Sequence, residues 1–219
     1  MDRVNWHFIM SHLPDFGEGL KVTLYVSLVS MGFAFVTGGL AGTVRALRIP
    51  VLSSLSGGYV AFIRSTPLLV QLYMIFYGLP SLHIVLTPFC ASVVALTLNS
   101  GAYIAEIVRG AIESIQRGQW EAAMSLGMNR LQQVRLVIIP QAARNVIPPL
   151  VGQFSYLIKD TSILGVVSLV ELTQVSANLQ AASFLPLESF IPSLFLYEVL
   201  IITLLVIFQK LERRFGFEA

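Results

Sequence analysis

Long apolar runs separated by short polar stretches dominate the pattern of this chain. Runs close to the length that spans a bilayer, about 20 mostly apolar residues, are expected at 20–44, 89–112, 146–170 and 192–208. A fifth region, 52–79, is less apolar, and we expect it to enter the membrane, break at Arg64-Ser65-Thr66-Pro67 and end at Pro80. The pattern predicts an all-α integral membrane protein with about five transmembrane helices, folded as one domain over residues 1–219.

Composition supports a membrane protein. Hydrophobic residues make up 55% of the chain and charged residues 12%, whereas soluble domains carry about a quarter charged residues. The first apolar run contains four glycines, which suit close helix packing in lipid: Gly32, Gly38, Gly39 and Gly42. Residues 1–18 carry acidic and histidine residues rather than a basic start and an apolar core, so we expect no signal peptide.

Basic residues indicate the orientation. Most of them flank ends that an odd number of spans puts on one side: Arg45, Arg48, Arg117, Arg130, Arg135, Arg144, Lys210, Arg213 and Arg214. The opposite side has only Arg3 and Lys21, against the acidic residues Asp2, Asp15, Glu18, Glu171 and Glu188. The positive-inside rule predicts an outer N-terminus and a cytoplasmic C-terminus.

One polar loop, residues 113–140, is expected in the cytoplasm. Its residues predict a short helix, a turn at Gly127 to Asn129, and a second helical start running into Pro140. Apolar and basic side chains alternate there, which suits docking into a groove on a soluble partner: Trp120, Met124, Leu126 and Met128 among Arg117, Arg130 and Arg135.

Polar residues inside apolar runs are costly in lipid and indicate a pathway or a site. One helical face carries Asn99, Tyr103, Glu106 and Gly110, and Arg109 is spaced to pair with Glu106. This face either lines a substrate pathway or forms a hydrogen-bond network between helices. Both interpretations remain open from the sequence.

Two breaks add candidate contacts. At Arg64-Ser65-Thr66-Pro67-Leu68, Ser65 or Thr66 is expected to cap a helix whose amino end suits a carboxylate. A second break is expected at Lys159-Asp160-Thr161-Ser162, with Asp160 or Thr161 as cap. Acidic Glu106 and Asp160, together with a helix amino terminus, would suit the zwitterion of an amino acid.

Catalytic and cofactor patterns are missing from the sequence. The three lysines, Lys21, Lys159 and Lys210, do not follow glycine as a Walker A loop requires, so the chain is not expected to bind ATP. Nucleophile and zinc-protease motifs are absent, and His7, His12 and His83 lack ligand-like spacing, so we expect neither an enzyme nor a metal site. No nucleic acid partner is expected.

Two sets of segments resemble a known family. Glu121, Ala122, Ala123, Gly127, Val137, Ile139 and Pro140 have the spacing of the EAA loop of permease subunits from ATP-binding-cassette importers. Further segments resemble permeases for polar amino acids: RSTPLLVQL at 64–72, YGLP at 77–80, NSGAYIAEIVRGAI at 99–112, GQWEAA at 118–123 and KDTS at 159–162. The resemblance covers about residues 20–215.

The resemblance implies the type I importer fold in a bacterial inner membrane. It implies two ATPase subunits that bind ATP and magnesium, a second permease subunit, identical or paralogous, and an extracytoplasmic binding protein. Glu121, as charge and cap, and Gly127, as the bend, would couple to the ATPase with Ala122, Ala123 and Pro140. The substrate-binding candidates are Arg64, Ser65, Thr66, Pro67, Leu68, Asn99, Tyr103, Glu106, Lys159, Asp160 and Thr161.

An alternative from another class is an ion-coupled carrier or channel that works without an ATPase. Glu106 and Asp160 would then be proton or sodium sites. About five spans without an inverted repeat argue against it, although a dimer could supply the symmetry. Which amino acid is carried stays open between arginine, glutamine, histidine and cystine.

Overall fold

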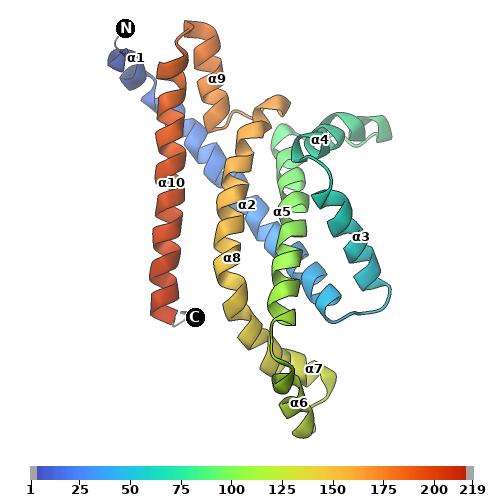
Figure 1. Ribbon diagram of the computed structural model, residues 1–219. Coiled ribbons are helices and arrows are strands. Elements are labelled where there is room, and N and C mark those ends of the chain that lie inside the picture. Colours follow the sequence, from blue (N-terminus) through green and yellow to red (C-terminus); the bar gives the residue numbers. More distant parts are fainter. Residues whose placement is uncertain (1–3, 216–219) are drawn as a thin grey trace. The chain divides into compact units, whose positions relative to one another are not determined.

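Helices make up the ordered structure of this protein in the computed structural model, which describes residues 4–215 (Figure 1). No strand occurs in that range, which confirms the all-α prediction. The α-helices are α1 (Trp6–Ser11), α2 (Leu13–Ala46), α3 (Leu52–Arg64), α4 (Leu68–Tyr73), α5 (Pro88–Glu113), α6 (Arg117–Ser125), α7 (Arg130–Gln132), α8 (Ile139–Asp160), α9 (Leu172–Ser183) and α10 (Pro186–Phe215). Shorter helical turns are η1 (Met74–Gly78), η2 (Leu79–Leu82), η3 (Gln133–Ile138) and η4 (Thr161–Val167).

Membrane spans agree with the prediction of about five. Three helices are long and apolar enough to cross a bilayer: α2, α5 and the Pro186–Lys210 part of α10. Counting each of two bent pairs as one span brings the number to as many as five: Leu52–Arg64 with Leu68–Leu82, bent by 105°, and Arg130–Val167 with Leu172–Ser183, bent by 47°. The first bend lies at the predicted break.

Several helix boundaries differ from the predicted ones. α2 begins at Leu13 instead of residue 20, because a long helix continues past the apolar run through Asp15 and Glu18. α8 begins at Ile139 instead of residue 146 and contains Pro148 and Pro149. Pro140 lies in the first turn of α8, where the backbone amide that proline lacks has no partner within the α-helix. Pro148 and Pro149 lie inside the helix, where prolines are tolerated in membrane proteins. The mixed stretch after residue 170 contains α9, which the sequence pattern did not predict.

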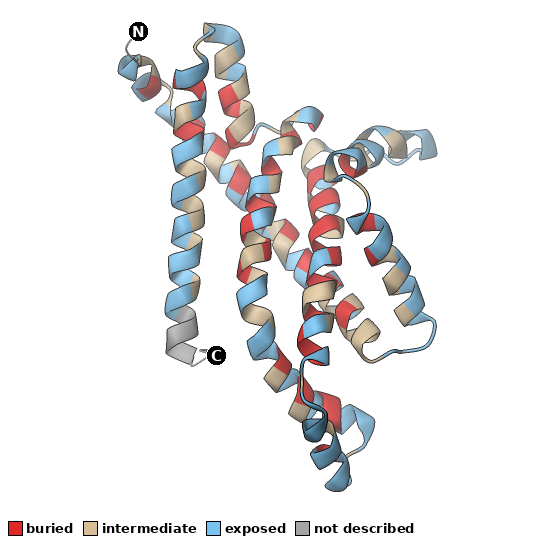
Figure 2. Cartoon of the chain, viewed as in Figure 1, coloured by how far each residue is buried: buried red, intermediate tan, exposed pale blue. Residues whose placement is uncertain are grey.

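The described residues form two compact units, and each is described by itself. The first comprises 4–31, 68–96 and 154–215, with a core around Val26, Leu72, Leu96, Leu157 and Leu164. In the same unit α9 packs against α10. Most of α10 beyond its first turns is exposed, as Figure 2 shows, as expected for a helix that contacts lipid. The prediction of one domain over residues 1–219 stays a prediction.

The second unit comprises Gly32–Pro67 and Thr97–Gln153. Its core contains Val60, Ile63, Ala102 and Ala105. Two of the predicted glycines bring α2 against α5, since a Cβ atom on Gly38 would lie 2.5 Å from the Gly101 carbonyl oxygen and one on Gly42 would lie 2.5 Å from the Ala105 oxygen. Gly32 and Gly39 have no such contact, because nothing lies within 4 Å of a Cβ atom there.

Candidate functional site

Glu106 lies in the middle of an arginine cluster in the second unit. Its Oε1 accepts a hydrogen bond from Arg45 Nη1 at 2.5 Å, and its Oε2 accepts one from Arg109 Nη2 at 2.7 Å. Arg64 Nη1 is 3.8 Å from Oε1. The predicted pairing of Glu106 with Arg109 is confirmed. Both carboxylate oxygens are occupied, which favours the network interpretation for Glu106 over direct contact with a substrate ammonium group.

The edge of this cluster is cationic. Arg109 also donates to Glu113 at 2.6 Å, so the arginines at 45, 64 and 109 face the two carboxylates of Glu106 and Glu113. The side chain of Arg64 is 44% exposed, and its Cζ lies 5.1 Å from the centroid of the Tyr103 ring. An exposed guanidinium beside an aromatic ring suits a carboxylate ligand.

Asn99 and its neighbours lie deeper in α5. Asn99 is 8% exposed and Ser100 is fully buried. Gln153 Nε2 donates to Ser100 Oγ at 3.3 Å, which joins α8 to α5 by a polar contact. On the predicted polar face of α5, Glu106 therefore belongs to an ion cluster, whereas the hydrogen bond to α8 is made by Ser100, which was not part of that predicted face.

At the break at Arg64–Leu68, Ser65 or Thr66 was predicted to cap the helix that follows, but both hydroxyls bond to the helix that precedes. Ser65 is the C-cap of α3, and the hydroxyls of Ser65 and Thr66 each donate to the Phe62 carbonyl oxygen at 3.0 Å. Both hydroxyls therefore satisfy the end of α3. Pro67 follows, and α4 begins at Leu68.

The break at Lys159–Thr161 lies in the first unit. α8 ends at Asp160 and η4 begins at Thr161, so the helix changes type at the predicted break, whereas the 47° bend lies further on, between Val167 and Leu172. Asp160 occupies the N-cap position of η4, as predicted, but its side chain makes no capping hydrogen bond. Thr161 is fully buried, and its hydroxyl donates to the Ile158 carbonyl oxygen at 2.8 Å, back into α8.

The charges at this second break have no ionic partner among residues 4–210, the part of the chain whose side chains the structure describes. The ion pairs of these residues include neither Lys159 nor Asp160. Lys159 Nζ lies 5.4 Å from the centroid of the Tyr156 ring. An unpaired carboxylate that is only partly buried can accept hydrogen bonds from an ammonium group.

The loop of α6 and α7 has the predicted course. α6 is followed by Gly127, whose φ of +73° is in the left-handed region that glycine adopts most readily. Asn129 Oδ1 accepts from the Gln132 backbone amide at 2.9 Å, and the Gln132 side chain accepts from the Asn129 amide, which forms a capping box. Glu121 lies in the middle of α6, where Gln116 is the N-cap, so the prediction that Glu121 is a cap is wrong.

Apolar side chains project from this loop. Met124 is 62% exposed, Leu126 77% and Leu131 74%. Trp120 instead packs under Arg130, whose Cζ lies 4.3 Å from the ring centroid. In α6, Ala123 is buried while Glu121 and Ala122 are exposed, and Pro140 is the second residue of α8. The loop presents apolar groups to its surroundings, as expected of a docking surface.

Sequence reasoning missed two contributors. Arg45 was interpreted only as a flanking charge, but it is the 2.5 Å partner of Glu106. Glu171 was counted as an outer charge, but it is fully buried, caps α9 through the Thr173 and Gln174 amides, and accepts from the Tyr197 hydroxyl at 2.7 Å. Glutamate before an apolar run was the only available signal for this cap.

Known proteins that resemble this chain in sequence are components of membrane transport systems. The sequence pattern of the family "Binding-protein-dependent transport system inner membrane component" matches residues 34–216. The glutamine transport system permease protein GlnP of Escherichia coli (strain K12) is 37% identical over 212 residues, which cover 96% of this chain and 97% of that protein.

Solved structures show the same fold. A crystal structure of an amino acid ABC transporter with histidines is similar with a TM-score of 0.90 at 33% identity, covering 97% of this chain and 100% of that chain. An inward facing conformation of the MetNI methionine ABC transporter has a TM-score of 0.82 at 22% identity, covering 95% and 99%. The similarity to MetNI shows only a shared fold, which is that of type I ABC importer permeases.

Proposed function

Because this chain belongs to the family of inner membrane components of binding-protein-dependent transport systems and is the permease subunit of an ATP-driven importer, we propose that the solute it carries is a polar amino acid. The relatives support this proposal, since the similar proteins include a permease named for glutamine and a transporter of amino acids. Arginine, glutamine, histidine and cystine all remain candidates.

The exposed apolar loop is the observation that carries the coupling part of the proposal. Met124, Leu126 and Leu131 have no covering element within the described chain, and a groove on a soluble ATPase subunit would bury them. ATP and magnesium would be bound by two such partner subunits. The proposed coupling residues are Glu121, Ala122, Ala123, Gly127 and Pro140.

The polar clusters are the proposed substrate contacts. In the first unit, Asp160, which has no ionic partner among residues 4–210, would receive an ammonium group with Lys159 and Thr161 beside it. Arg64 and Tyr103 offer a cation and a ring for a carboxylate, and Glu106 holds the arginines in place. Asn99 and the residues of the first break, Ser65, Thr66, Pro67 and Leu68, complete the proposed set.

The remaining partners follow from the same proposal. An extracytoplasmic binding protein would deliver the amino acid, and a second permease subunit, identical or paralogous, would complete the pathway. The proposed orientation places the N-terminus outside and the C-terminus in the cytoplasm. Asp2 and Arg3, used for this orientation, lie outside the described residues.

Uptake by vesicles that contain this chain with its ATPase and binding protein tests the proposal. Gly127→Val forces a β-branched residue into a left-handed conformation at a cost of about 1–3 kcal/mol, although space is open there. We expect uptake to fall about tenfold, while the binding protein still binds the amino acid and the complex still assembles. Gly127→Asn, which tolerates this backbone, and Gly118→Ala within α6 are controls that keep uptake.

The alternative makes a different prediction. If the chain works alone as an ion-coupled carrier, uptake will follow an ion gradient without the ATPase and will survive Gly127→Val. ATP-dependent uptake of a solute other than an amino acid would retain the importer and overturn the substrate class.

A further inference from the structure

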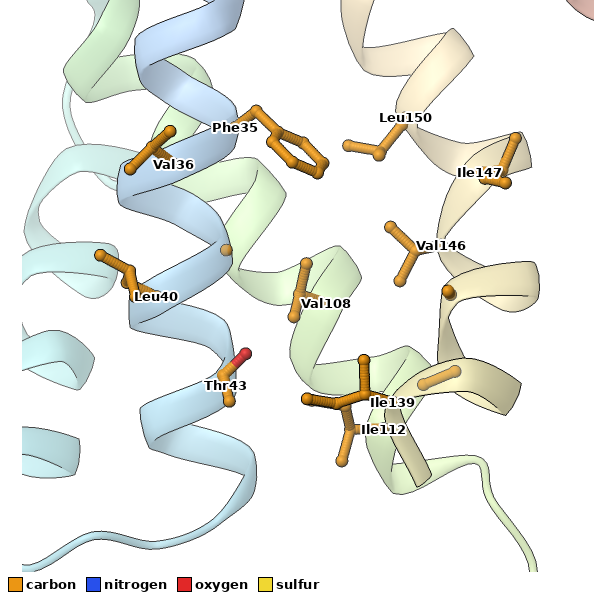
Figure 3. Close-up of a pocket in the computed structure, with 13 residues that line it drawn as sticks. Phe35, Val36, Leu40, Thr43, Val108, Ile112, Ile139, Val146, Ile147 and Leu150 are labelled. Atoms are coloured by element: carbon orange, nitrogen blue, oxygen red, sulfur yellow. The ribbon is translucent and has the colours of Figure 1, made fainter. Parts of the chain in front are cut away.

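A large apolar cavity opens in the second unit, away from the proposed substrate contacts. Its volume is about 700 Å³, and it is lined by α2, α5 and α8. Figure 3 shows Phe35 of α2 and Val108 of α5 facing it, with Val146 and Leu150 of α8. Thr43 supplies the only side-chain hydroxyl of the lining. Such a cavity suits a hydrocarbon and offers almost nothing to a polar solute.

The length of the cavity matches one leaflet. On α2 the lining runs from Phe35 to Thr43, which is about 12 Å at 1.5 Å per residue. On α8 it runs from Ile139 to Leu150, about 16 Å on the same scale. Half of a bilayer's hydrocarbon core is about 15 Å. One acyl chain of a lipid fits this dimension.

A basic pocket adjoins the apolar cavity, since Ile112 lines both. The pocket has a volume of about 670 Å³, and its charged and aromatic lining is Arg48, Arg109, Glu113, Arg117, Trp120 and Arg130. Four arginines face a single carboxylate there. Tryptophan is typical of the level of the lipid headgroups.

Two of these arginines are available for a ligand. Arg109 pairs with Glu106 and Glu113, and Arg130 stacks on Trp120. Arg48 and Arg117 are exposed, and among the described side chains of residues 4–210 no ion pair includes them. The pocket therefore has uncompensated positive charge next to an apolar cavity of acyl-chain length.

We propose that this pair of pockets binds an anionic phospholipid, with its phosphate at Arg48 and Arg117 and one acyl chain in the cavity lined by Phe35, Val108 and Val146. The charge of the basic pocket favours an anionic lipid over a zwitterionic one. None of the proposed coupling or substrate residues lines either pocket, although Arg117, Trp120 and Arg130 lie in the same loop as the coupling residues. Failure of the lipid proposal would leave the proposed function unchanged.

Native mass spectrometry of the purified complex, incubated with equal amounts of phosphatidylglycerol and phosphatidylcholine, tests the proposal. We expect the wild type to retain phosphatidylglycerol in preference, and Arg48→Gln with Arg117→Gln to reduce that preference about tenfold. The matched control is Arg135→Gln with Arg144→Gln, two exposed arginines that do not line the pocket.

A second pair of variants tests the acyl chain. Gly39 lines the cavity, and a Cβ atom there meets nothing within 4 Å, so Gly39→Leu fills the cavity without a clash at the backbone. We expect it to lower retention of both lipids several-fold. Gly32→Leu, on the same helix with equally open space but outside the cavity, leaves retention unchanged.

Four outcomes would overturn the proposal. Equal loss of preference in both arginine pairs would indicate general surface charge. Displacement of phosphatidylglycerol by soluble glycerol phosphate would indicate a site for a free anion. Equal lipid retention in Gly39→Leu and the wild type would exclude an acyl chain from the cavity. If Gly39→Leu also makes two copies of the permease dissociate, the cavity is occupied by the second copy instead. Unchanged preference in Arg48→Gln with Arg117→Gln would exclude the headgroup site.

Discussion

Glu106 and Asp160 are two acidic residues in apolar runs, and the structure gives them opposite surroundings. Glu106 has both oxygens hydrogen-bonded to arginines, with a third arginine at 3.8 Å. Asp160 has no ionic partner among residues 4–210, and its side chain makes no capping hydrogen bond. An intramembrane carboxylate is a structural ion pair or an available ligand according to the charges that other segments bring to it.

Removing the charge of Glu106 is expected to have the largest effect on stability. Glu106→Gln leaves Arg45, Arg64 and Arg109 close together without their shared carboxylate. Because the Glu106 side chain is only 21% exposed, we expect a loss of about 2–4 kcal/mol. Thermal unfolding of the purified complex measures it. An unchanged melting temperature would remove the distinction between Glu106 and Asp160.

Packing beneath the Glu106 cluster is the next test. Gly38→Ala places a methyl group 2.5 Å from the Gly101 carbonyl oxygen, a backbone atom that cannot move aside, and we expect a loss of about 1–3 kcal/mol. Gly39→Ala, one residue away in open space, is the matched control and should be neutral or slightly stabilising. Equal melting temperatures for the two variants would show that α2 and α5 are not in close contact.

The arginines around Glu106 are expected to contribute unequally to the stability of the protein. Arg45 donates at 2.5 Å and its side chain is 17% exposed, so Arg45→Gln should cost about 1–2 kcal/mol. Arg64 is 3.8 Å away and 44% exposed, so Arg64→Gln should cost less than about 0.5 kcal/mol. Melting temperatures of the two variants, each measured in low and in high salt, would distinguish the contribution of Arg45 from that of Arg64. A larger loss for Arg64→Gln would contradict the described cluster.

The smallest effect is expected at the second break. Tyr156→Leu removes the ring 5.4 Å from Lys159 Nζ, an interaction worth about 0.5–1 kcal/mol at an exposed site. We expect the affinity for the amino acid to change by about two- to fivefold, with stability unchanged. Tyr25→Leu is a control, since Tyr25 is similarly exposed and stacks on Phe89 instead. Equal changes in both variants would exclude a local role for Lys159.

Local sequence rules predicted much of this fold and site. The apolar runs predicted the spans, the Gly127-to-Asn129 signal predicted the turn and the cap, and the spacing of Glu106 and Arg109 predicted their ion pair. The turn, the cap and the ion pair each depend on residues within about four positions of one another, and each span depends on one continuous apolar run. Such features are encoded by helix periodicity and capping chemistry.

Features that depend on distant segments were not predictable. Arg45 is 61 residues from Glu106, and nothing in a single sequence indicates that α2 and α5 bring them together. The burial of Glu171 depends likewise on Tyr197 and on α9, which follows a polar stretch. Asp160 occupies the predicted cap position, but whether its side chain makes the capping hydrogen bond depends on the geometry at the end of α8, which its sequence neighbours do not specify.

Equilibrium binding of labelled glutamine, arginine, histidine and cystine to the purified complex, each tested separately on wild type, Asp160→Asn and Glu106→Gln, tests the central claim most directly. For the amino acid that the wild type binds, we expect Asp160→Asn to lower affinity at least about tenfold with an unchanged melting temperature. Glu106→Gln should keep affinity within about threefold while melting earlier. Loss of binding in Glu106→Gln at an unchanged melting temperature, with normal binding in Asp160→Asn, would contradict the account.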